Sequence, residues 1–191
     1  VNLVQRVEPF SLLEEATTID EPSVRGRALS LLISSVVDSA GGRYGLQALG
    51  DPDPWVQQQG VFALSNRLHE SQTVKILADF VGRTDEWVNA YAQSSAAIRL
   101  IHAGYKEHIE PHKGQFKKFK DRPWQGLPLA FYAALLGDEE GEAVLQQGLS
   151  VADIGVESEF FIDIAQSKKT GLLPALEAGQ ELAEEEVTLA Y

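Results

Sequence analysis

The side chains best suited to metal chemistry lie between positions 102 and 112. They are His102, Glu107, His108, Glu110 and His112. His108 and His112 are spaced i, i+4, which would align them on one face of a helix, but Pro111 lies between them and disrupts a helix at that point. No glutamate follows His108 directly, as the zinc-protease pattern requires. We therefore predict no metal site and no cofactor.

A basic segment, residues 105–124, overlaps these histidines and carries six Lys or Arg against three Asp or Glu. Its lysines and phenylalanines interleave: Lys113, Phe116, Lys117, Lys118 and Phe119. This interleaving is found in grooves for single-stranded nucleic acid, so the three lysines are candidate binding residues. The alternative is a basic amphipathic helix over 109–119 that turns both phenylalanines to the core and leaves the lysines solvated. The net charge of the whole chain, −12, repels phosphate backbones, so we do not expect nucleic acid as the main partner.

No arrangement of nucleophiles or carboxylates predicts catalysis. The chain has no cysteine, which excludes thiolate chemistry and fits a reducing, cytoplasmic setting. Acidic runs such as 138–140 and 184–186 are typical of solvated helix ends rather than of buried catalytic pairs. Ser94 and Ser95 precede two alanines, which suits close helix packing better than a nucleophile elbow. The chain is therefore not predicted to be an enzyme.

The tryptophans point to the elements that would position all these residues. Trp87 follows Trp55 by 32 positions, and Trp124 follows Trp87 by 37. Each tryptophan stands at the same place in a recurring phrase. A residue that recurs in step with the fold normally serves the fold. Each ring is expected to pack against the preceding repeat, and the alternative is an aromatic surface for a ligand or peptide.

The recurring phrase has the chemistry of a helix start. Asp53 stands where an N-cap would, and Pro54 occupies the first helical position, where its missing N–H costs nothing. The valines of three phrases, Val24, Val56 and Val88, are 32 residues apart each time. Apolar and small residues then follow at helical spacing. The predicted second helices are 25–37, 57–68, 89–103 and 125–136, and the predicted first helices are 10–18, 43–49, 71–81, 109–119 and 139–149.

The sequence thus predicts an all-α chain that folds as a right-handed α-solenoid, an α–α superhelix of about five to six helix pairs. We expect a single domain, 1–191, and the approximate repeats are 9–38, 43–68, 71–103, 107–137, 139–168 and 171–191. No sustained alternation predicts a strand. Glycines at the ends of predicted helices, among them Gly104, Gly137, Gly155 and Gly171, suit a left-handed cap.

Two of the phrases, Asp20 to Val24 and Asp51 to Leu64, resemble the bacterial HEAT-like repeats found in phycobilisome lyase subunits. In that motif an arginine usually follows the valine. Arg25 keeps it, whereas Gln57 and Asn89 replace it. The resemblance implies an architecture and leaves function open.

A solenoid of this kind would present a curved surface lined mainly by its second helices. The expected contact residues are their polar positions: Arg25, Gln57, Gln58, Asn89, Gln93 and Gln125. We therefore predict a non-enzymatic protein-binding or scaffold module with no membrane partner, and the acidic charge favours a protein partner with basic patches. The alternative that the resemblance implies is a subunit like the bilin lyases, whose tetrapyrrole would need an apolar cleft lined by aromatics such as Trp87, Tyr91 or Tyr132.

Overall fold

The computed structural model describes residues 9–36, 40–85, 87–119 and 123–149, and every regular element in these ranges is a helix. The prediction of an all-α chain is confirmed for this part. The chain divides into two compact units, residues 1–108 and 109–191. The boundary falls inside the basic segment, and each unit is described by itself.

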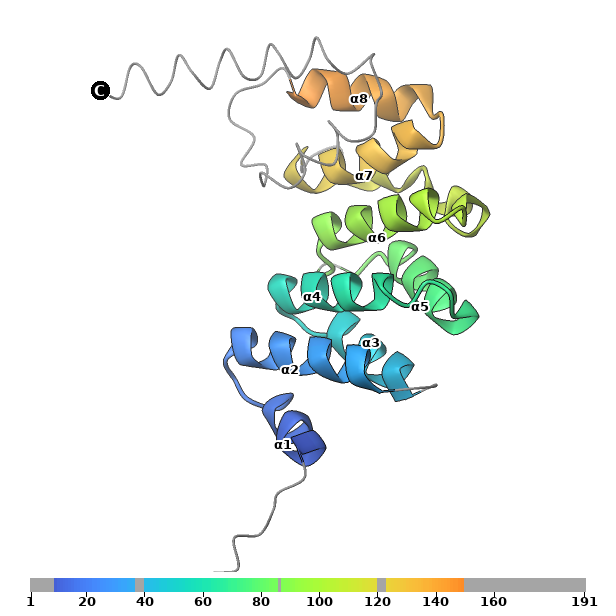
Figure 1. Cartoon of the computed structure of the whole chain (residues 1–191). Helices are drawn as coiled ribbons and strands as arrows, with labels where there is room; N and C mark the ends of the chain where they lie inside the picture. The colour runs from blue at the N-terminus through green and yellow to red at the C-terminus, as the bar shows by residue number, and fades with distance from the viewer. Residues whose placement is uncertain (1–8, 37–39, 86, 120–122, 150–191) are drawn as a thin grey trace, which may run out of the picture. The chain divides into compact units, whose positions relative to one another are not determined.

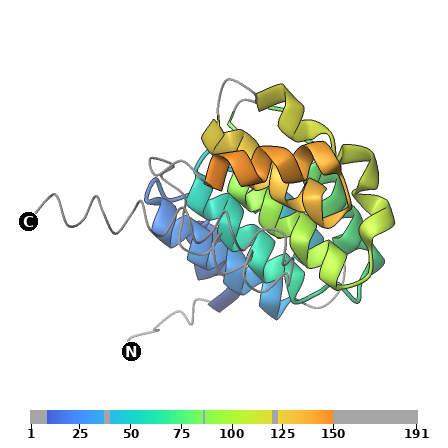
Figure 2. The same cartoon turned by 90° about the horizontal axis from the view of Figure 1, so that it is seen from above.

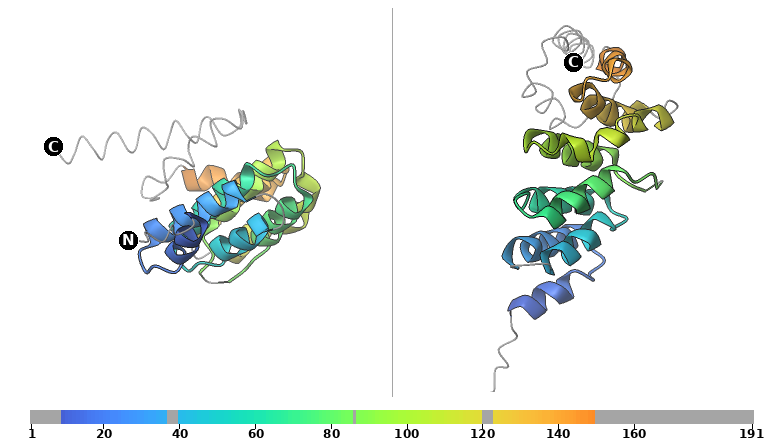
Figure 3. Two further views of the ribbon diagram at one scale, coloured as in Figure 1. Left: turned by 60° about the horizontal axis from the view of Figure 1, so that its bottom comes forward. Right: turned by 90° about the vertical axis from the view of Figure 1, so that its right-hand side faces the viewer.

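The described residues of the first unit form six α-helices and a short 3₁₀ turn (Figures 1 and 3). They are α1 (Pro9–Ala16), α2 (Pro22–Ser35), α3 (Ala40–Leu49), α4 (Pro54–Ser65), α5 (Ser71–Val81), α6 (Ala90–His102) and η1 (Lys106–His108). Within this unit α2 packs against α4 and α4 against α6, while α3 packs against α5 on the other side. Helices that alternate along the chain therefore form two layers, and α2, α4 and α6 make one of them.

The helices α2, α4 and α6 each begin at a side-chain cap, and the cap of α4 is the predicted Asp53. Glu21 accepts a hydrogen bond from the N–H of Ser23 at 3.3 Å, and Asp53 accepts from the N–H of Trp55 at 2.9 Å. Asn89 caps α6 by accepting from the N–H of Ala92 at 2.8 Å. Each side chain thereby satisfies an N–H group that has no partner within its helix.

The cap of α6 corrects the register expected from the valines. By that register Asn89 should match Arg25 and Gln57 inside the helix, whereas it is the residue that precedes the helix. A separate turn, closed by the hydrogen bond from the N–H of Val88 to the carbonyl of Asp85, takes up the intervening residues. The helix therefore begins one turn later than the spacing of the valines predicts.

Small residues bring the two layers of the first unit close together. A Cβ atom on Gly60 of α4 would come within 2.7 Å of the Ala48 Cβ of α3, and one on Gly45 of α3 would come within 2.6 Å of the Leu64 side chain. Leucines from both layers are fully buried between them: Leu29, Leu32, Leu64, Leu77 and Leu100. The contact between α3 and α4 therefore depends on having no side chain at positions 45 and 60.

The described part of the second unit is a helical hairpin preceded by 3₁₀ turns. It comprises η2 (Glu110–His112), η3 (Gln115–Phe119), α7 (Pro123–Leu135) and α8 (Glu139–Leu149), and Figure 2 shows α7 and α8 side by side. Gly137 lies in the connecting turn with a φ of +83°, and Gly104 of the first unit has a φ of +88°, so both predicted glycine caps are confirmed.

The predicted α-helix over 109–119 is wrong, because the structure has only 3₁₀ turns there. Pro111 lacks the N–H that an α-helix would use, and Gly114 adds backbone freedom where the two turns meet. The parts of the predicted repeats that lie beyond Leu149, with Gly155 and Gly171, fall outside the described residues.

Candidate interaction face and its supporting network

The fourth residue of each helix in the α2/α4/α6 layer is polar and is hydrogen-bonded to the loop before its own helix. These residues are Arg25, Gln57 and Gln93. Arg25 donates to the carbonyls of Ile19 and Asp20, both at 2.9 Å. We call this set the inner polar row. Its recurrence was hidden in the sequence, because the spacing of the valines matched Asn89, and not Gln93, to the other two.

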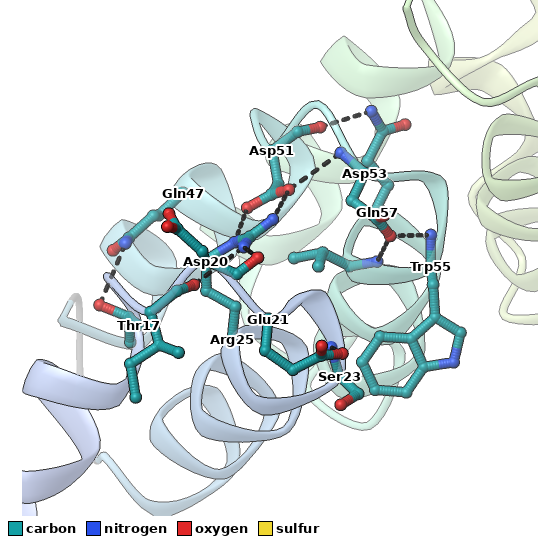
Figure 4. A network of polar contacts seen from close by, with 12 residues as sticks. Thr17, Asp20, Glu21, Ser23, Arg25, Gln47, Asp51, Asp53, Trp55 and Gln57 are labelled. Atoms are coloured by element: carbon teal, nitrogen blue, oxygen red, sulfur yellow. Dashed lines mark hydrogen bonds and ion pairs between the residues drawn. The ribbon is translucent and has the colours of Figure 1, made fainter.

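Arg25 also joins its helix to the loop that precedes α4 (Figure 4). Its Nε lies 2.7 Å from Asp51 Oδ2 and its Nη2 lies 2.9 Å from Asp51 Oδ1, which is a two-point guanidinium–carboxylate pair. Both side chains are largely buried, with 15% and 9% of their surfaces exposed. The pair therefore fixes the edge of α2 against the edge of α4.

The environment of Asp51 also determines its protonation. Burial acts to raise the pKa of Asp51, but the hydrogen bonds from Arg25 and from the N–H of Asp53 outweigh it and hold the pKa below its ordinary value of 3.8. The carboxylate is therefore charged at neutral pH, and the same pairing raises the pKa of Arg25.

Gln57 performs the same task between α4 and α6 without any charge. Its Nε2 donates to the carbonyls of Asp51 at 2.8 Å and Trp87 at 3.1 Å, and its Oε1 accepts from the N–H of Asn89 at 2.9 Å. One buried amide thus satisfies main-chain groups from the loops before both helices. Figure 4 shows the bond to Asp51 beside the arginine pair.

Gln93 binds to the end of α5 and to the loop between α5 and its own helix. Its Nε2 donates to the carbonyls of Phe80 at 3.0 Å, Val81 at 3.2 Å and Arg83 at 2.9 Å. These carbonyls lie in the last turn of α5 and just after it, where the regular hydrogen bonds of the helix end, and the carbonyl of Phe80 also accepts from the N–H of Arg83. The side chain therefore closes the end of α5.

These contacts revise the predicted contact face. Gln57 is completely buried and Gln93 is 2% exposed, so neither side chain is available on the surface, because both serve main-chain groups of the interior. Arg25 is held by Asp51, and Asn89 is held as a helix cap. Gln58 is half-buried on α4, and Gln125 is half-buried on α7 in the second unit.

The outer side of the layer carries a different set of residues. Exposed and half-exposed positions recur every three or four residues along each helix, which places them on one face. On α2 they include Val24, Arg27, Leu31 and Ser34; on α4 Trp55, Gln58, Phe62 and Ser65; on α6 Tyr91, Ser95, Arg99 and His102. We call this surface the outer face. Of its members, only Gln58 was among the contact residues predicted from the sequence.

Two large apolar side chains are the most prominent members of the outer face. Leu31 is 53% exposed and Phe62 is 54% exposed. The guanidinium carbon of Arg99, on α6, lies 5.3 Å from the centre of the Phe62 ring on α4, which is a cation–π contact between neighbouring helices. Apolar and cationic groups therefore lie together on this surface.

The tryptophans differ from one another despite their shared place in the sequence. A Cβ atom on Gly26 of α2 would lie 2.4 Å from Trp55 Cζ3, so Trp55 packs against the preceding repeat as predicted. Trp87 is 48% exposed and lies under the Arg83 guanidinium, whose central carbon is 5.0 Å from the ring centre. The late start of α6 explains the difference, because Trp87 precedes this helix whereas Trp55 belongs to the first turn of α4. The side chain of Trp124 lies outside the described residues.

Two buried aromatic side chains anchor residues 112–116 of the basic segment. Phe116 is 3% exposed, and Tyr132 of α7 is fully buried and donates its hydroxyl to the carbonyl of His112. Burial raises the pKa of Tyr132 well above the ordinary value for tyrosine. A buried hydroxyl that is already hydrogen-bonded leaves Tyr132 without an open surface for a tetrapyrrole.

The candidate lysines of the basic segment differ in their exposure and partners. Lys113 is half-buried, whereas Lys117 and Lys118 are exposed. Lys117 pairs with Glu140 of α8, and this hydrogen bond raises the pKa of Lys117. Their arrangement gives no particular support to a groove for nucleic acid.

The histidines lie at the surface or half-buried, with His102 and His108 exposed. Among the residues that the structure describes, no three His, Asp or Glu side chains converge as ligands for a metal ion. Within the same residues, no helix has both the length and the apolar character needed to cross a membrane. No family model, curated protein or solved structure matches the chain.

Proposed function

We propose that this chain is a non-enzymatic protein-interaction module of HEAT-like α-solenoid type, and that the outer face of α2, α4 and α6 contacts the partner. The observation that carries the proposal is the exposure of Leu31 and Phe62 on adjacent helices of one layer. An exposed apolar patch on a packed layer is typical of a protein-binding surface.

Two features of the first unit support the solenoid part of the proposal. Helices that alternate along the chain stack in two layers. The inner polar row repeats one position, the fourth residue of the helix, in three successive helices of one layer. A role that recurs from repeat to repeat is expected where each repeat packs mainly on its neighbours.

The proposed partner is a protein, and the net charge of −12 favours the approach of partners with basic patches over long distances. Several carboxylates lie at the edge where α2, α4 and α6 begin, namely Asp20, Glu21, Asp53 and Asp85. This edge is where a basic patch would be attracted. Together, the helices of the outer face carry arginines and no Asp or Glu.

Site-specific photo-crosslinking tests the proposal. A photoreactive phenylalanine analogue at position 62 is compared with the same analogue at position 46, because Leu46 of α3 is 58% exposed and belongs to the other layer. In an extract of the source cells, we expect discrete polypeptide adducts from position 62 that position 46 does not give. Equal labelling from both positions, or none from position 62, would contradict the proposed face.

An absorbance titration tests the tetrapyrrole alternative in the same preparation. The intact protein is titrated with a bilin and with haem, and an interaction module should give no spectral shift. A saturable shift that is lost when Trp87 or Tyr91 is replaced by leucine would favour chromophore handling instead.

A further inference from the structure

We infer that the outer face of α2, α4 and α6 recognises an acidic peptide segment that also carries aromatic or aliphatic side chains. The inference rests on the proposed function and specifies the chemistry of the partner. Three observations lead to it: the charges of the helices, the apolar groups beside those charges, and the position of the carboxylates around them.

The first observation is the absence of carboxylates from the layer. None of α2, α4 and α6 contains an Asp or Glu, although the whole chain contains 28. Their charged side chains are Arg25, Arg27 and Arg99, and Arg25 is neutralised by Asp51. No carboxylate of the described residues forms a salt bridge with Arg27 or Arg99. The outer face is therefore cationic in a strongly anionic protein.

The second observation is the apolar surface next to these cations. Leu31 and Phe62 are each more than half exposed, and Val24 is 38% exposed. Arg99 lies over the Phe62 ring, so its guanidinium is held close to an apolar surface rather than extended into water. A ligand that places a carboxylate at Arg99 would place a neighbouring side chain on Phe62, and its chain could continue across α4 towards Leu31 on α2.

The third observation argues against a nucleic acid. Asp20, Glu21 and Asp53 lie at the edge where α2 and α4 begin, close to the outer face. A phosphate backbone is a continuous line of charge that would meet these carboxylates as well as the two arginines. A peptide can place a few carboxylates at the arginines and keep other residues near the edge. The charge pattern therefore favours the peptide.

Selection from a random peptide library tests this inference on the full chain. Phage that display 16-residue random peptides are selected against the intact protein, and the bound peptides are then synthesised and titrated by fluorescence anisotropy. We expect the selected pool to be enriched in Asp and Glu interspersed with Phe, Trp, Leu or Ile. Binding should weaken as salt is raised, because part of the attraction is electrostatic.

The variants map the binding to the face. Arg99→Glu and Arg27→Glu should each lower the affinity for a selected peptide by at least about ten-fold. Phe62→Ser should lower it by about five-fold or more, as expected for a central interface residue. The matched controls are Lys75→Glu and Leu46→Ser, which change exposed residues of α5 and α3, in the other layer, and should leave affinity within about two-fold. Circular dichroism verifies that each variant is folded.

The possible outcomes separate the inference from the function on which it rests. Peptides that are basic, or whose binding is unaffected by the Arg99 and Phe62 variants, would overturn the acidic-peptide inference and leave protein binding intact. Displacement of the peptides by a single-stranded oligonucleotide at equal concentration would assign the face to nucleic acid instead. A selection that yields no specific peptide, together with no crosslink from position 62, would overturn both.

Discussion

Gln57 shows how much of the packing between successive helices depends on a single side chain. Its amide group serves two carbonyls and one N–H, which belong to the loops before α4 and α6. Gln57 itself is completely buried; its bond to the carbonyl of Asp51 is buried, and those with Trp87 and Asn89 are part-buried. Leaving such groups without partners costs far more than an ordinary hydrogen bond contributes.

Replacing Gln57 by leucine should therefore destabilise the first unit by about 3 kcal/mol, since three main-chain groups in buried or part-buried hydrogen bonds lose their partner. Chemical denaturation followed by circular dichroism measures the change. Gln59→Leu, at a half-exposed position of the same helix, should change the free energy of unfolding by less than about 0.5 kcal/mol. Equal effects of the two substitutions would show that hydrophobic gain, and not hydrogen bonding, governs position 57.

Arg25 and Asp51 make the contact between α2 and α4 dependent on pH. Because the folded pKa of Asp51 lies below 3.8, its contribution to stability is fully present above that pH and is lost as pH falls through the folded pKa. Arg25→Met should cost about 2–3 kcal/mol at pH 7, because a largely buried carboxylate loses its partner. Denaturation curves between pH 7 and pH 2.5 give the free energy of unfolding of Arg25→Met and of the parent protein. The gap between the two values should narrow as Asp51 becomes protonated. A gap that stays constant would contradict this assignment.

Among the elements, α6 best shows what the sequence could and could not predict. The helix was predicted within a residue or two at each end, because its apolar periodicity and the turn before it are strong local signals. Its register within the repeat was not. A shift of four residues is close to one helical turn, so the apolar stripe looks the same before and after it. The capping hydrogen bond of Asn89 shows that the helix begins after residue 89 and not one turn earlier.

The register of α6 can be tested through its cap. Asn89→Ala should destabilise the protein by about 1 kcal/mol, because an N–H of the first turn loses its acceptor. Asp85→Ala should cost less, about 0.5 kcal/mol, because Asp85 only pairs with Arg83 at the surface. The valine register predicts the opposite order, since it would make Asp85 the cap. Thermal unfolding of both variants, with Thr84→Ala as an exposed control, decides between the two registers.

The candidate site was less predictable than the helices. Arg25, Gln57 and Gln93 were predicted to lie on the surface of the second helices. A polar side chain in a mostly apolar helix is expected to face solvent when its tertiary partner is not known. The structure provides those partners in neighbouring loops and at the end of α5, 26 residues away for Arg25, up to 32 for Gln57 and 10 to 13 for Gln93. The outer face was missed because only polar positions were predicted as contact residues, whereas two of its large exposed members, Leu31 and Phe62, are apolar.

For the whole molecule, the division at residue 108 predicts some independence of the first unit. It has its own buried leucines, its own capped helices and its own inner polar row. A fragment of residues 1–108 should therefore be helical and unfold cooperatively. Gln57→Leu should destabilise this fragment and the full chain by similar amounts. A fragment with helical circular dichroism but no cooperative transition would show that the first unit needs the rest of the chain.

The arginine and glutamine connections have a consequence for how the first unit opens. The seam between α2 and α4 is held at one end by Arg25 with Asp51 and at the other by Arg67, which donates to the carbonyls of Ile33 and Val36. The seam between α4 and α6 has a neutral amide at one end and a cation–π contact at the other. In the 1–108 fragment, amide hydrogens of α6 should therefore exchange with deuterium before those of α2, as mass spectrometry of the peptides would record. Local unfolding of the first unit would thus proceed from α6 towards α2. The part of the outer face that carries Arg99 would unfold first.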